Sequence, residues 1–192
     1  GSGPPALAGI DKRLPLDSFR VSVRNGKGKM PAFRDLDGGD AALGAHVHPS
    51  PVREIGWYPL ALSPAAASDP LFRHLDPRTP VFQWHAYTFT EPRDSVLLAS
   101  TKGCANQAFR YRDFAYGLQF QLEVDEALIR RWLRQSQLQH ELEPLGGDAH
   151  ARLVEQQTAE YLQHSQAQAA ELFTAFVERL GWGRKALALR SR

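Results

Sequence analysis

The sequence has 192 residues but only one cysteine, one methionine and almost no excess of either charge. A single cysteine, Cys104, excludes an internal disulfide and fits a reducing compartment. The formal net charge of +2 gives no electrostatic reason to expect nucleic acid as a partner. No apolar run approaches the roughly 18 residues that cross a bilayer. Residues 1–20 lack the basic start and apolar stretch of a signal peptide. We therefore expect no membrane partner either.

What is present is typical of a soluble globular protein. Apolar residues make up 43% of the chain and charged residues 23%. The length suits one domain with a sizeable core and is short for two. The chain begins at Gly1 without an initiating methionine. We therefore expect a processed chain, a tagged chain or a fragment of something longer.

From Ala45 onward the pattern predicts short strands separated by turn-rich clusters. The predicted strands are Ala45–His48, Glu54–Leu62, Val81–Phe89, Ser95–Ser100, Asn106–Tyr111 and Tyr116–Val124. Beyond them the pattern becomes helical. Asp125 can cap a helix that Pro144 breaks, and a long helix with a recurring apolar face follows and ends by Gly181 or Gly183. Strands followed by helices predict an α/β fold.

Five segments, in chain order, carry a resemblance to a known family. They are Ala42-Leu43-Gly44-Ala45, Glu54-Ile55-Gly56-Trp57, Phe82-Gln83-Trp84-His85, the pair Leu98-Ala99-Ser100 with Asn106-Gln107-Ala108-Phe109, and Gly117-Leu118-Gln119-Phe120-Gln121-Leu122-Glu123. Over roughly residues 42–182 they resemble the later part of the class I glutamine amidotransferase domain, in its stand-alone and GMP-synthase-like members. The resemblance implies a partial, flavodoxin-like α/β sheet with C-terminal helices, in which the nucleophile-bearing N-terminal half is missing. It assigns residues 42–192 to this incomplete domain.

The resemblance also implies a Cys-His-Glu triad that hydrolyses glutamine, with the histidine and glutamate two residues apart on one strand face. It places Glu123 at the position of the triad acid and Gln121 at the position of the histidine. A glutamine amide cannot act as a general base near neutral pH. Cys104 lies downstream of the expected nucleophile, and a small buried thiol is its favoured role. We therefore expect no glutaminase activity from this chain.

Three histidines are candidates for a role in a site. The resemblance brings the segment of His85 close to the active site, which makes His85 a weak candidate for a substrate contact. A structural histidine between Trp84 and Tyr87 is the favoured interpretation. His46 and His48 share a strand face, but two imidazoles without a third ligand favour a surface pair over a metal site.

Residues 1–41 resemble part of a small class I cytochrome c instead. The resemblance rests on Gly3–Gly9, Phe19 and Val23–Phe33. It implies Met30 as an axial haem ligand. The haem attachment motif C-x-x-C-H is absent, so we expect this chain to bind no cofactor. We would expect haem c only if an upstream segment carried that motif. A Gly/Pro-rich lead segment is the alternative. The two families differ in compartment, and the longer amidotransferase segment favours the cytoplasm.

The sequence thus favours an amidotransferase-like domain, related to glutamine hydrolysis and ammonia transfer, that is catalytically inactive. The alternatives are a haem-associated electron-transfer fragment that uses Met30, and a non-catalytic interaction module. A further alternative is that an upstream segment or partner chain supplies the cysteine, although Gln121 would still need a substitute base. Expected partners are glutamine, if any site survives, and a second copy that covers an exposed sheet edge.

Overall fold

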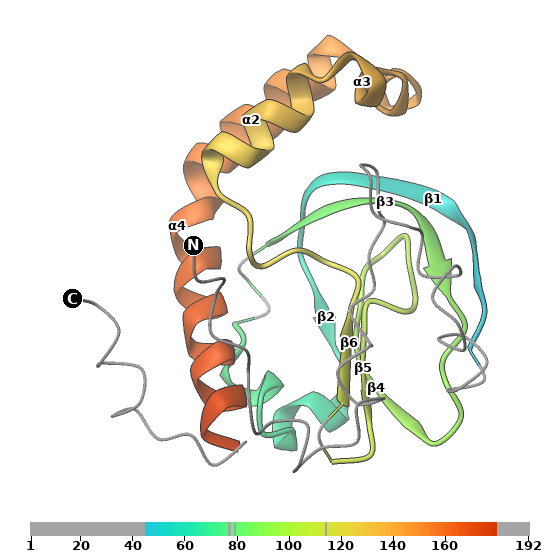
Figure 1. Cartoon of the computed structure of the whole chain (residues 1–192), viewed down its shortest axis with the longest axis vertical. Coiled ribbons are helices and arrows are strands. Elements are labelled where there is room, and N and C mark those ends of the chain that lie inside the picture. Colours follow the sequence, from blue (N-terminus) through green and yellow to red (C-terminus); the bar gives the residue numbers. More distant parts are fainter. Residues whose placement is uncertain (1–44, 77, 79, 114, 180–192) are drawn as a thin grey trace, which may run out of the picture.

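The computed structural model describes residues 45–179 except 77, 79 and 114 (Figure 1). The strands are β1 Val47–Tyr58, β2 Ala61–Leu62, β3 Val81–Phe89, β4 Ser95–Ser100, β5 Ala108–Tyr111 and β6 Ala115–Leu118. The α-helices are α2 Glu126–Arg134, α3 Ser136–Leu142 and α4 Asp148–Arg179, and the short 3-10 helices are η3 Pro64–Ser68, η4 Phe72–His74 and η5 Glu143–Leu145. The prediction of an α/β fold with C-terminal helices is confirmed.

The strands form two antiparallel sheets. β1 pairs with β3, and the second sheet has the order β2-β4-β5-β6. Both sheets lie to one side of α4, which runs along the molecule (Figure 1). Among the described residues β6 pairs only with β5, and a homodimer through this end of the sheet stays a prediction.

Four of the six predicted strands differ from the observed ones. The strand predicted over Glu54–Leu62 is divided between β1 and β2, and the one predicted over Asn106–Tyr111 begins at Ala108 as β5. β1 is a single strand across the Pro49-Ser50-Pro51 cluster, because β3 pairs with both parts and the register shifts between Pro49 and Glu54. The strand predicted to reach Val124 ends at Leu118 as β6. Beyond it, Gln119 N still donates to Gln107 O just before β5, and an isolated bridge then joins Gln121 to Phe82 of β3.

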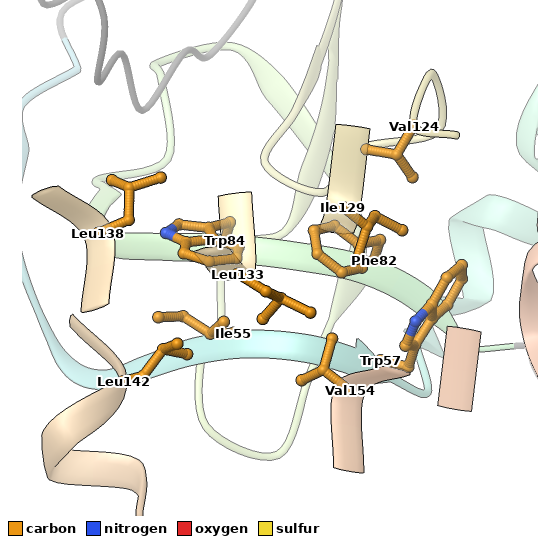
Figure 2. Packing of buried hydrophobic residues seen from close by; sticks show 10 residues of the cluster. All are labelled: Ile55, Trp57, Phe82, Trp84, Val124, Ile129, Leu133, Leu138, Leu142 and Val154. Carbon is orange, nitrogen blue, oxygen red and sulfur yellow. The ribbon is translucent and has the colours of Figure 1, made fainter. Parts of the chain in front are cut away.

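One hydrophobic cluster fills the space between the β1–β3 pair and the helices (Figure 2). Its aromatic rings interlock, with the Trp57 and Phe82 centroids 5.5 Å apart in a T-shaped arrangement. The buried members are Ile55, Trp57, Phe82, Trp84, Val124, Ile129, Leu133, Leu138, Leu142 and Val154. A second cluster lies around η3, η4 and the β2-β4-β5-β6 sheet.

The helices follow the capping and breaking signals of the sequence in part. Asp125 caps α2, since its Oδ1 accepts from Leu128 N at 2.6 Å. The helix predicted to continue to Pro144 is instead divided at Gln135, whose backbone is extended. The end of α4 that was predicted at Gly181 or Gly183 lies outside the described residues. A membrane span needs a long and uniformly apolar helix, and the described part of the chain contains none.

Candidate functional site: a buried polar network

A network of polar side chains lies on the face of the β1–β3 pair opposite the aromatic cluster. Glu54 and His85 are direct partners in the ladder, as are Ile55 and Trp84. Because side chains alternate along a strand, the polar pair and the apolar pair point to opposite faces. Glu54 and His85 are each only 1% exposed. Such buried polar groups are stable only when they are hydrogen-bonded.

The Glu54 carboxylate is the centre of the network. Its Oε2 lies 2.9 Å from His85 Nε2 and accepts from Gln107 Nε2 at 2.6 Å. Its Oε1 accepts from the Thr101 hydroxyl at 2.6 Å. Thr101 follows β4 and Gln107 precedes β5, so the carboxylate joins the β1–β3 pair to the second sheet. Gln83, which pairs with Gly56 in the ladder, extends the hydrogen-bond network, because its Nε2 donates to Gln107 Oε1 at 2.9 Å.

The other ring nitrogen of His85, Nδ1, lies next to the segment that follows β6. Gln119 Nε2 lies 2.9 Å from His85 Nδ1. The same amide nitrogen lies 3.0 Å from His85 Nε2. Glu54 and Gln119 together hold the imidazole in place. His85 is 1% exposed, as expected of a structural histidine.

Cys104 is buried beside the same network. Its Sγ lies 3.1 Å from Thr88 Oγ1 and 3.5 Å from Gln119 Nε2. It is 3% exposed, so the prediction of a small buried thiol is confirmed. Within the described residues, none of the hydrogen bonds of its Sγ involves Gln121 or Glu123.

The two predicted triad positions lie at the edge of this network. Gln121 N donates to Phe82 O at 2.9 Å, which anchors the backbone of Gln121 to β3. Its carboxamide Oε1 is buried and has no hydrogen-bond partner among the described residues. Glu123 is exposed to solvent. Gln119, two residues before Gln121, is the residue of this segment that contacts His85.

The other predicted site residues lie apart from the network. His46 and His48 are both exposed, as expected of a surface pair. Within the described residues no group of three or more His, Cys, Asp or Glu side chains is arranged to hold a metal ion. Met30, and with it the segment 1–41, lies outside the described residues.

Most of this network could not be predicted from the sequence. The signal that the sequence does carry is the presence of Glu54, Gln83 and His85 within strands that are otherwise apolar. A polar residue in a buried strand must find a partner, but the sequence does not say which one. The partners here are separated by 31 residues for Glu54 and His85 and by 53 for Glu54 and Gln107.

Comparisons with known proteins agree on one type of fold. No family model matches the chain. The putative glutamine amidotransferase-like protein YfeJ of Salmonella typhimurium is 34% identical over 96 residues, which are 50% of this chain and 40% of that protein. A glutamine amidotransferase structure from Thermotoga maritima aligns with a TM-score of 0.61 and 30% identity. One from Methylobacillus flagellatus aligns with a TM-score of 0.55 and 22% identity, a likeness that shows the fold alone.

The chain therefore has a glutamine amidotransferase-like fold, and the likeness to YfeJ and to the Thermotoga structure supports that family. Each alignment with a solved structure covers 73% of this chain but 58% of the relative. The chain thus spans little more than half the length of these relatives, and about 40% of YfeJ is matched.

Proposed function

We propose that this chain is an amidotransferase-like domain that does not hydrolyse glutamine by itself. Its relatives are described as glutamine amidotransferases, and the chain shares their fold over the aligned part. The observation that carries the proposal is the identity and placement of Gln121. Its backbone is held against Phe82 of β3, while its side chain is a carboxamide that cannot take a proton from a nucleophile.

Among the described residues, neither of the other two triad roles has a suitable group beside Gln121. Cys104 contacts Thr88 and Gln119 inside the network and is closed to a substrate by burial. Glu123 is exposed, and a carboxylate contributes to a triad only by orienting an imidazole. In a well-studied triad, loss of the nucleophile or the base lowers the turnover rate on the order of 10⁶-fold. Loss of both costs about as much as loss of either one, so we expect hydrolysis close to the background rate.

His85 does not replace the missing base. Its Nε2 lies 2.9 Å from Glu54 Oε2 and its Nδ1 lies 2.9 Å from Gln119 Nε2, so both ring nitrogens are engaged inside the protein. A base must reach the proton that it removes, at about 2.6–3.2 Å or through one water molecule. Even if another segment supplied a cysteine, the chain would therefore need a base that its described residues do not offer near Gln121.

The test is to restore the base alone. We expect the chain and its Gln121→His variant to release glutamate from glutamine at the same rate as buffer, because the imidazole has no thiolate to activate. Gln163→His, at an exposed position of α4, is the matched control. Release above background by the unchanged chain, or by Gln121→His and not by Gln163→His, would show that a nucleophile is present and would overturn the proposal.

A further inference from the structure

We draw no further inference here: the strongest candidate, the edge of β6 that faces away from β5 in the second sheet, carries nothing, because nothing in the described part of the chain shows what covers it.

Discussion

Glu54 and His85 face each other across β1 and β3, with Oε2 and Nε2 2.9 Å apart and both side chains buried. This contact joins more than two strands. Through Thr101, Gln107 and Gln119 it connects the β1–β3 pair to the segments that follow β4, precede β5 and follow β6. The pair is therefore the polar junction between the two sheets, on the opposite face from the aromatic cluster of Figure 2.

Replacing the central carboxylate should destabilise the fold strongly. Glu54→Ala leaves the donors of Thr101, Gln107 and His85 buried without their acceptor, and we expect a loss of about 3 kcal/mol or more in the free energy of unfolding. Urea denaturation measures it. Glu126→Ala is the control, because Glu126 forms only an exposed pair with Arg130 on α2, and it should cost less than about 0.5 kcal/mol. Equal losses in the free energy of unfolding for the two variants would show that Glu54 is not the central acceptor of the network.

The contact between β1 and α4 offers a second test. Trp57 Nε1 donates to Thr158 Oγ1 at 2.9 Å, and both residues are buried. Thr158→Val keeps the shape but leaves the indole N–H without an acceptor, and we expect a cost of about 1–3 kcal/mol.

Thr174→Val is its control on the same helix. Thr158 and Thr174 each donate to the carbonyl four residues earlier at 2.7 Å, but only Thr158 accepts from an indole. The Thr174 variant should therefore change the free energy of unfolding by less than about 0.5 kcal/mol. A Thr158→Val cost no larger than this would mean that the Trp57 hydrogen bond does not stabilise the protein.

Tyr116 should make the stability depend on pH in the alkaline range. Burial, and then the negative charge of Asp69, raise the pKa of Tyr116 above its ordinary value. The folded state therefore favours the protonated phenol. This contribution is fully present below the ordinary tyrosine pKa of about 10 and is lost as the pH rises through the higher folded-state pKa.

The measurement compares the unchanged chain with Tyr116→Phe, which does not titrate. Between about pH 8 and about pH 11 the unchanged chain should lose more stability than the variant does. Parallel losses in both proteins would show that Tyr116 does not contribute to the pH dependence.

The regular strands could be predicted from the sequence because their signals are local. Val81–Phe89 and Ser95–Ser100 were predicted with the bounds that the structure has. β1 could not be predicted as one strand, because the Pro49-Ser50-Pro51 cluster signals a break. In the structure β3 pairs with β1 on both sides of that cluster. β6 was predicted too long, because the apolar pattern continues to Val124 whereas its pairing partners end near Ala108.

The candidate site was predictable only in part. The positions of Gln121 and Glu123 came from a resemblance that local motifs carry. The bond between Glu54 and His85 depends on the register of β1 and β3, which a sequence does not state, and Gln119 reaches His85 only after β4, β5 and β6 are assembled. Long-range polar partners of this kind are fixed by the whole fold.

The measurement that tests the central claim most directly is glutamate release from glutamine by the purified chain and by its Glu123→Ala variant. The account predicts that both proteins match buffer alone, because Gln121 cannot act as a base and Cys104 is buried. Release by the unchanged chain that disappears in Glu123→Ala would show a working triad and would contradict the account.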